Sequence, residues 1–180
     1  MATKGSKALE KELYDPVKRH LEERFRQKFG FGNCYLEITA DGSFSDTLKS
    51  FVRHDIVFSF LGKKASPDLA GFIIREGAPP LWAPTLSRSD IKDFITVEIK
   101  REKIAPQDIY QAKMYGDLFQ AKYALLISPE PIPEEIRRLD QNLFVTYRFM
   151  SGWYLHIGQW FGQANSIVES RWLPHSPFRD

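Results

Sequence analysis

Three charged residues lie at the ends of two apolar runs, where their side chains could act together. Asp68 follows a proline at the start of one run, and Glu98 and Lys100 close another. If the two runs are neighbouring strands, the two carboxylates can share one hard cation, and oxygen ligands are what Mg²⁺ prefers. Lys100 would then orient or deprotonate a water and offset negative charge that develops on a phosphate.

The run that ends at Lys100 has the alternation of a strand. We expect a strand over residues 94–99, in which successive side chains point to opposite faces. Thr96, Glu98 and Lys100 then share one face. Three isoleucine and valine side chains share the other: Ile95, Val97 and Ile99.

Two other acidic residues compete with these positions. Asp55 stands at the start of an earlier apolar run and could replace Asp68 if the strand register differs. Asp90 and Lys92 repeat the acid-x-lysine spacing around Ile91, but they precede the apolar run of their strand. We therefore expect Asp90 and Lys92 to lie away from any site.

The elements that must position these residues alternate between helix and strand. An amphipathic helix begins near Ser6, with apolar residues every four positions. We expect strands over 34–39, 51–61, 68–75, 94–99, 124–128 and 143–149, helices over 106–120 and 133–140, and a hairpin that joins 51–61 to 68–75 through Gly62, Lys63 and Lys64. Residues 76–89 contain three prolines and predict a loop. This order predicts an α/β fold, a three-layer sandwich with a central mixed sheet and helices on its faces.

We expect one domain over residues 1–180, with a core over about 7–148 and a β-rich extension over 149–180. The extension is rich in aromatic residues and predicts two strands around residues 162–166. Trp153, Trp160 and Trp172 could stack on unpaired bases, cover the sheet or form a homodimer contact. The small local charge favours packing or a dimer, so a homodimer is predicted as possible.

Composition limits the classes of protein further. The 180 residues are 43% hydrophobic with a net charge of +2, which is typical of a globular chain and too little charge to indicate nucleic-acid binding by itself. A single cysteine, Cys34, cannot form an internal disulfide. We expect a cytoplasmic protein with no membrane partner, because the sequence has neither a membrane-spanning run nor an apolar leader. The four histidines show no paired metal-ligand spacing.

The Pro-Asp and Glu-x-Lys motifs, followed directly by a helix, resemble those of the PD-(D/E)XK nuclease superfamily, also called restriction-endonuclease-like. The resemblance covers roughly residues 7–148 and implies a restriction-endonuclease-like fold. Its acidic position falls on Asp68 and its E-x-K falls on Glu98 and Lys100. The helix that follows contains Gln111 and Tyr115, which resemble the Q-x-x-x-Y motif of the RecB-like exonuclease branch and share one helix face.

The family often carries a further carboxylate on the helix before the sheet. Glu10 and Glu12 are the candidates, and the helical phase places Glu10 among the apolar residues, so we choose Glu10 first and Glu12 second. The resemblance implies a Mg²⁺-dependent nuclease, with Mn²⁺ as a substitute, that hydrolyses phosphodiester bonds, most plausibly in DNA. Asp68, Glu98 and the main-chain carbonyl of Ile99 would bind the metal.

The alternative is a catalytically inactive module of the same fold that binds nucleic acid or assembles with a partner. The intact set of two acids and a lysine argues against it. Phosphate contacts would come from basic side chains around the metal site. The candidates are Lys63, Lys64, Arg88, Lys92, Arg101 and Lys103.

Overall fold

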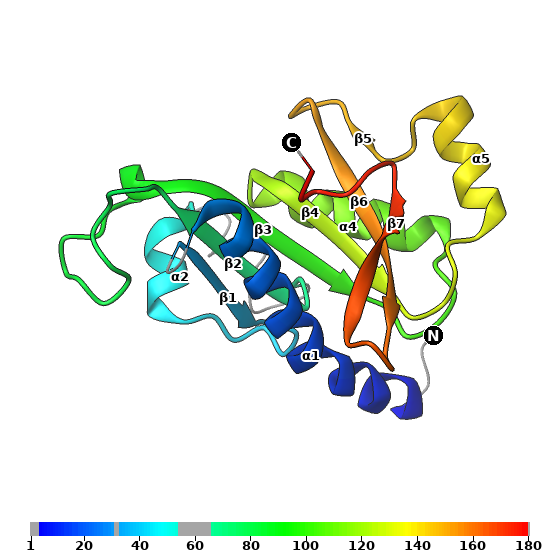
Figure 1. The fold of residues 1–180 in the computed structure, drawn as a ribbon, viewed down its shortest axis with the longest axis horizontal. Helices are drawn as coiled ribbons and strands as arrows, with labels where there is room; N and C mark the ends of the chain where they lie inside the picture. The colour runs from blue at the N-terminus through cyan, green and yellow to red at the C-terminus, as the bar shows by residue number, and fades with distance from the viewer. Residues whose placement is uncertain (1–3, 31–32, 54–65, 180) are drawn as a thin grey trace.

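The computed structural model describes residues 4–30, 33–53 and 66–179, and it shows a mixed seven-stranded sheet flanked by helices (Figure 1). The helices are α1 (Lys4–Phe29), α2 (Asp46–Phe51), α4 (Pro106–Leu118) and α5 (Glu134–Leu143), with a 3-10 turn η1 (Arg88–Asp90). The strands are β1 (Cys34–Ile38), β2 (Leu69–Ile74), β3 (Ile91–Ile99), β4 (Ala121–Ser128), β5 (Tyr147–Arg148), β6 (Trp153–Phe161) and β7 (Ser166–Leu173).

The sheet combines antiparallel and parallel pairs. Its order is β1-β2-β3-β4-β6-β5, and β7 also pairs with β6. Strand β2 is antiparallel to both of its neighbours, β1 and β3, whereas β3, β4 and β6 are parallel. The carboxyl ends of β3 and β4 therefore lie at one edge of the sheet, which is the edge where β2 begins.

Helix α1 covers one face of the sheet. Its buried side chains at Val17, Leu21 and Phe25 pack against Ile95, Val97 and other apolar residues of the central strands. This is the stripe that the four-residue spacing predicts. The strand alternation in β3 is also confirmed, because the isoleucine and valine side chains face α1 while Thr96 and Glu98 are buried on the other side.

Helices α2, α4 and α5 cover the opposite face. Leu48 and Phe51 of α2 pack over β2, and Ile109 and Ala112 of α4 pack over β4. Gly116 lets α4 approach closely, because a Cβ there would lie 2.7 Å from the Cβ of Ala124. The expected layered α/β architecture is therefore present, and α4 is held against the strand next to β3.

The aromatic extension is part of the core. Strands β6 and β7 form the expected pair, and Trp160 and Trp172 are buried among the residues that α1 covers. Trp160 is only 2% exposed, so it can neither stack on a base nor form the contact of a homodimer. Of the three interpretations, packing within the chain is the one that the structure supports for Trp160 and Trp172.

The hairpin predicted for residues 68–75 was wrong, because β2 has other partner strands than expected. β2 pairs with β1 on one side and β3 on the other, so residues 51–61 do not supply its neighbour. Phe51 instead ends α2, an unpredicted short helix whose N-cap Ser45 accepts a hydrogen bond from the Leu48 amide at 3.1 Å. Residues 54–65, including Lys63 and Lys64, lie outside the described residues.

The strand expected over residues 143–149 is also shorter than predicted. Leu143 is the last residue of α5, and Phe144 adopts a left-handed conformation with φ of 50°. Only Tyr147 and Arg148 are extended and paired, with β6. Arg148 is buried beneath α4 and donates hydrogen bonds to Asp117 and to the Ala121 carbonyl. These polar contacts, rather than the apolar pattern of residues 143–149, determine the conformation of this segment.

A search of the described helices for a segment that could span a membrane found none with the necessary length and apolar character.

Candidate active site

Asp68 is held at the point where the chain enters β2. The Thr39 amide donates to its carbonyl at 2.8 Å, and the Thr39 hydroxyl donates to the Pro67 carbonyl at 2.6 Å. The carboxylate reaches toward the end of β3, where Oδ2 accepts from the Ile99 amide at 2.7 Å. Oδ1 accepts from the Tyr14 hydroxyl of α1 at 2.9 Å. Two elements far apart in the sequence thus fix the direction of this acid.

Glu98 projects from β3 into the layer between the sheet and α4, where it is 4% exposed. Its Oε2 atom is buried and has no hydrogen-bond partner among the described residues. Burial and the nearby negative charge of Asp68 raise the pKa of Glu98 to about 8. A buried carboxylate oxygen without a partner is costly, and a cation placed between the two acids would relieve that cost.

The positive charge of Lys100 partly offsets the negative charge of the Glu98 carboxylate. Its Nζ lies 2.8 Å from Oε1 of Glu98 and 3.7 Å from Oδ1 of Asp108. Partial burial acts to lower the pKa of Lys100, but the acids Glu98, Asp108 and Asp68 outweigh this effect and the pKa is raised. Lys100 is therefore a protonated ammonium group at neutral pH.

The main chain of Ile99 also faces the site. The next residue, Lys100, donates its amide to Ile127 of β4 at 2.8 Å. The Ile99 amide instead points to the β2 side, where it meets Asp68. Because the N–H and C=O groups of one residue in an extended strand point to the same side, the Ile99 carbonyl is also directed to the β2 side, beyond the last ladder pair of Leu69 with Val97.

Gln111 and Tyr115 come together on α4. The Gln111 Nε2 donates to the Tyr115 hydroxyl at 3.3 Å, as the four-residue spacing predicts. Tyr115 is buried, and its pKa is raised by desolvation first and then by the negative charges of Glu98 and Asp68, although the Gln111 hydrogen bond opposes the shift. The negative charges of Glu98 and Asp68 therefore act on the Tyr115 hydroxyl, to which Gln111 is bonded.

Two residues of the site were missed in the sequence. Asp108 lies in the first turn of α4, where it accepts from the Ala105 amide at 2.8 Å. Its position two residues after Pro106 is a typical helix-start pattern that could have indicated a carboxylate near Lys100. Tyr14 offered no signal beyond its place on the apolar face of α1, because its contact with Asp68 depends on tertiary packing.

The remaining acidic candidates have different outcomes. Glu10 lies within α1, four residues before Tyr14, and its side chain lies outside the described part of the chain. Glu12 is exposed, and the choice between Glu10 and Glu12 stays a prediction. Asp55 is outside the described residues. Asp90 accepts from the Ser87 amide and hydroxyl at 2.8 and 2.7 Å, so it closes a local turn away from the site as expected.

The basic candidates do not all surround the two acids. Lys92 is the second residue of β3 and Glu98 the eighth, so at about 3.3 Å per residue they are roughly 20 Å apart. Lys92 and Arg88 lie over the rings of Phe29 and Phe94, at 4.4 and 4.6 Å from the ring centres. The expectation that they cluster at the site was wrong. Two candidates, Arg101 and Lys103, follow shortly after the end of β3 and are exposed.

Among the described residues, neither cysteine nor histidine belongs to this site. Cys34 is buried on the α1 side, and desolvation raises its pKa to about 12, so it is a structural residue. Within the described ranges there is no group of three or more His, Cys, Asp or Glu side chains arranged to hold a metal. Side-chain metal ligands among these residues would be the Asp68 and Glu98 pair.

A scan against protein-family models gives no match, and neither do searches of curated proteins and of solved structures. The function is therefore inferred from the contacts of the residues themselves.

Proposed function

We propose that this chain is a metal-dependent nuclease that hydrolyses phosphodiester bonds, with DNA as the expected substrate. The observation that carries the proposal is the Glu98 carboxylate, which is buried beside Asp68 with its Oε2 lacking a hydrogen-bond partner in the described structure. Burial of an acid next to a second negative charge lowers stability unless a cation offsets the two charges. An acid on a helix surface or at a solvated strand end would keep its carboxylate in water and would not be buried in this way.

The donor set suits a hard divalent cation. Asp68 and Glu98 supply carboxylate oxygens, and the Ile99 carbonyl is directed to the same side of the strand. Oxygen ligands of this kind fit Mg²⁺, with Mn²⁺ as a substitute. When bound, the ion would polarise the scissile phosphate and lower the pKa of the attacking water.

The protein's own residues would divide the remaining tasks. Because its pKa is raised, Lys100 keeps its proton, which favours orienting the water and offsetting phosphate charge over acting as a general base. Tyr14 and the Ile99 amide hold Asp68 in one direction. Gln111, held by its hydrogen bond to the buried Tyr115, would contact the substrate phosphate from α4, and Glu10 would add a carboxylate from α1.

The order of the elements supports a restriction-endonuclease-like assignment. The corrected pairing still leaves Asp68 at the start of the second strand, with Glu98 and Lys100 at the end of the third and α4 directly after. Arg101 and Lys103 continue beyond the site, where they could meet the phosphates that flank the scissile bond.

Cleavage assays with Mg²⁺ and with Mn²⁺ test the proposal, using duplex DNA, single-stranded DNA and RNA as substrates. We expect metal-dependent cleavage that Asp68→Asn and Glu98→Gln each reduce by about 100-fold or more, because a neutral amide does not supply the charge that holds the ion. Asp90→Asn is the matched control and should cleave like the wild type. Cleavage by both site variants at the wild-type rate would exclude the assigned roles.

Calorimetric titration with Mg²⁺ separates this function from an inactive nucleic-acid-binding module of the same fold. The nuclease requires metal binding that weakens in Glu98→Gln. Nucleic-acid binding with neither metal binding nor cleavage would instead favour the inactive module.

A further inference from the structure

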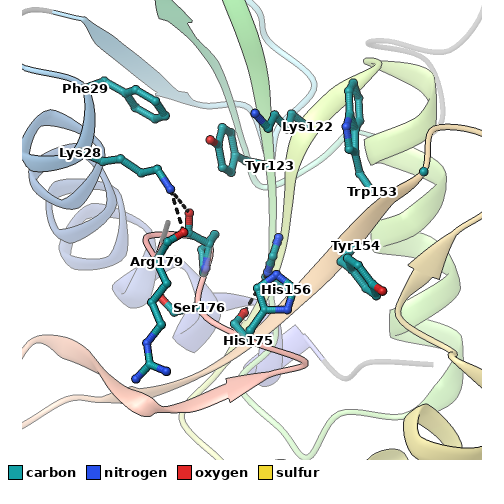
Figure 2. A pocket seen from close by; sticks show the side chains of 12 residues that line it. Lys28, Phe29, Lys122, Tyr123, Trp153, Tyr154, His156, His175, Ser176 and Arg179 are labelled. Atoms are coloured by element: carbon teal, nitrogen blue, oxygen red, sulfur yellow. Dashed lines mark hydrogen bonds between the residues drawn. The ribbon is translucent and has the colours of Figure 1, made fainter.

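A pocket lies at the opposite end of the sheet from Glu98. It is a hollow of about 390 Å³ between the end of α1, the starts of β4 and β6, and the segment that follows β7 (Figure 2). Because β3, β4 and β6 are parallel, the starts of β4 and β6 face away from the edge that holds Lys100. The pocket is therefore separate from the candidate active site.

The described lining is cationic and aromatic. It contains Lys28, Lys122 and Arg179 but neither Asp nor Glu. Figure 2 shows Lys28 on one side and the rings of Trp153 and Tyr154 on the other. The Arg179 guanidinium turns away from the pocket, and its Nε lies 3.9 Å from Glu169.

Two lysines supply the inward charge. Lys28 points into the pocket and donates to the carbonyls of Pro177 and Arg179 at 3.2 and 3.0 Å (Figure 2). Lys122 Nζ lies 5.6 Å from the ring centre of Tyr123 and 3.9 Å from Asp93 Oδ2, with the lysine side chain 43% exposed. Asp93 is only 14% exposed and Lys122 stays its counter-charge, but at 3.9 Å the contact is long, so the ammonium group keeps N–H donors for a bound anion.

His156 supplies a fixed hydrogen-bond acceptor among these groups. Its Nδ1 lies 2.9 Å from the His175 carbonyl, and since a carbonyl can only accept, Nδ1 carries the hydrogen. Burial lowers the pKa of His156 to about 4, so the ring is neutral at pH 7 and Nε2 is an acceptor. His156 is 7% exposed and lines the pocket.

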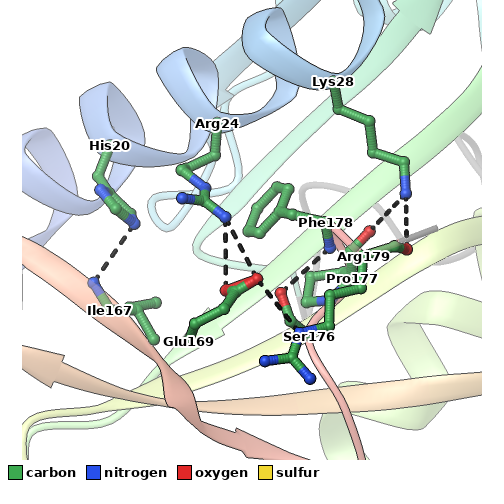
Figure 3. A network of polar contacts seen from close by, with 9 residues as sticks. All are labelled: His20, Arg24, Lys28, Ile167, Glu169, Ser176, Pro177, Phe178 and Arg179. Atoms are coloured by element: carbon green, nitrogen blue, oxygen red, sulfur yellow. Dashed lines mark hydrogen bonds and ion pairs between the residues drawn. The ribbon is translucent and has the colours of Figure 1, made fainter.

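The wall formed by the last described residues is firmly attached to the rest of the molecule. Figure 3 shows Lys28 holding the carbonyls of Pro177 and Arg179, while Arg24 contacts Glu169 of β7 at 3.4 Å. The Phe178 ring packs against Phe25 of α1, with ring centres 5.0 Å apart. A wall fixed by this many contacts gives the hollow a defined shape before any ligand binds.

The combination selects the chemistry of a ligand. Two ammonium groups favour a doubly charged anion such as a phosphate, and the neighbouring aromatic rings favour a flat apolar group on the same ligand. The acceptor on His156 calls for an N–H donor on that group. A simple anion would leave the rings and the imidazole unused, and an uncharged aromatic compound would leave the lysines unused. The volume lies in the range of about 300–1,000 Å³ that is usual for small-molecule sites.

We propose that this pocket binds a nucleoside phosphate, either free or at the 5′ end of a nucleic-acid strand, with the phosphate near Lys28 and Lys122 and the base beside Trp153, Tyr154 and His156. This site is independent of the proposed cleavage, because it shares no residue with the two acids and Lys100. The two proposals can therefore fail separately.

Titration of the full chain with each of the four nucleoside 5′-monophosphates tests the site, with tryptophan fluorescence and calorimetry as readouts. We expect saturable binding of at least one nucleotide. Lys122→Glu should weaken it by about tenfold or more, because it places a negative charge beside the phosphate. Trp153→Ala should weaken it by at least about fivefold, since base stacking on an aromatic ring contributes that much.

Lys49→Glu is the control for the change of charge, because the Lys49 side chain is 45% exposed, close to the 43% of Lys122, and does not line the pocket. It should bind like the wild type, and Glu98→Gln should also retain binding even if cleavage is lost. Tighter binding of a 5′-phosphorylated dinucleotide than of the mononucleotide would identify a strand end as the ligand, and equal binding a free nucleotide. The proposal is overturned if no nucleotide binds saturably, or if inorganic phosphate binds equally well and Trp153→Ala has no effect.

Discussion

Glu98 is buried on the α4 side of β3, next to a second acid and in contact with a protonated lysine. Its raised pKa means that the folded chain binds a proton there that the unfolded chain releases at a lower pH. The same proton must leave before a cation can bind. The protonation of this residue therefore links the stability of the chain to its proposed metal affinity.

The stability of the metal-free protein should decrease as the pH rises from about 4.5 to about 8, because the folded-state pKa of Glu98 lies above its ordinary value. The slope from one such group is at most about 1.4 kcal/mol per pH unit. Denaturant unfolding in EDTA at several pH values measures it. Glu98→Gln should flatten this dependence and be the more stable protein at pH 8. An unchanged slope in that variant would show that Glu98 does not carry the proton.

Lys100→Ala should reduce cleavage by about 10²–10⁴-fold, because it removes the cation that would orient the water and offset phosphate charge. The fold should persist, since the Nζ contacts are with Glu98 and Asp108 and not with the apolar core. Initial cleavage rates and thermal melting measured together check this expectation. Lys49→Ala is the control, as Lys49 is an exposed lysine of α2 that pairs with Asp46 at 3.6 Å and has no part in the proposed site. Equal rates in the two variants would contradict the role of Lys100.

At the scale of elements, the site depends on how closely β2 approaches its neighbour β1. Gly71 in β2 has no room for a side chain, because a Cβ there would lie 1.9 Å from the Tyr35 carbonyl oxygen of β1. The carbonyl oxygen belongs to the main chain and the position of a Cβ is fixed by the backbone, so the clash cannot be relieved by a rotamer change. The backbone of β2 also carries Asp68 at its entrance.

Gly71→Ala should therefore destabilise the protein by about 1–3 kcal/mol or more and weaken the pairing of β1 with β2. Denaturant unfolding gives the change in free energy, and hydrogen exchange of the Tyr35 and Leu36 amides locates it. Gly162→Ala is the control, because a Cβ at that position meets no heavy atom within 4 Å and should leave stability almost unchanged. Equal stability of the two variants would show that β1 and β2 separate without cost.

At the scale of the whole molecule, the extension over residues 149–180 completes the core that α1 covers. Trp160 lies under α1, with its ring 5.6 Å from that of His20 in an edge-to-face arrangement. Loss of so large a buried ring leaves a cavity that the surrounding residues cannot fill. The extension is therefore required by the same fold that positions the candidate active site.

Trp160→Ala should lower the free energy of unfolding by about 3–5 kcal/mol without changing the oligomeric state. Denaturant unfolding and analytical ultracentrifugation at the same protein concentrations check both parts. Phe149→Ala is the control, since Phe149 is 77% exposed and its removal should change stability little. A dimer that dissociates in Trp160→Ala while the monomer keeps its stability would contradict the buried position of this ring. The homodimer itself stays a prediction.

The sequence by itself determined features that depend on near neighbours. The two-residue period of a strand separates Ile95 and Val97 from Thr96 and Glu98, and the four-residue spacing of a helix brings Gln111 to Tyr115. These patterns follow from the geometry of the local backbone, so they hold whatever the rest of the chain does. The two acids and Lys100 could be proposed together on that basis.

Only the tertiary structure decided which strand lies beside β2, because several apolar runs compete for that edge and their pairing energies depend on packing across the whole core. For the same reason the contact of Tyr14 with Asp68, the burial of Glu98 and the pocket around His156 have no local pattern. Each joins segments that are distant in the sequence. Local periodicity could thus identify the charged residues, whereas long-range packing set their directions, their protonation and their neighbours.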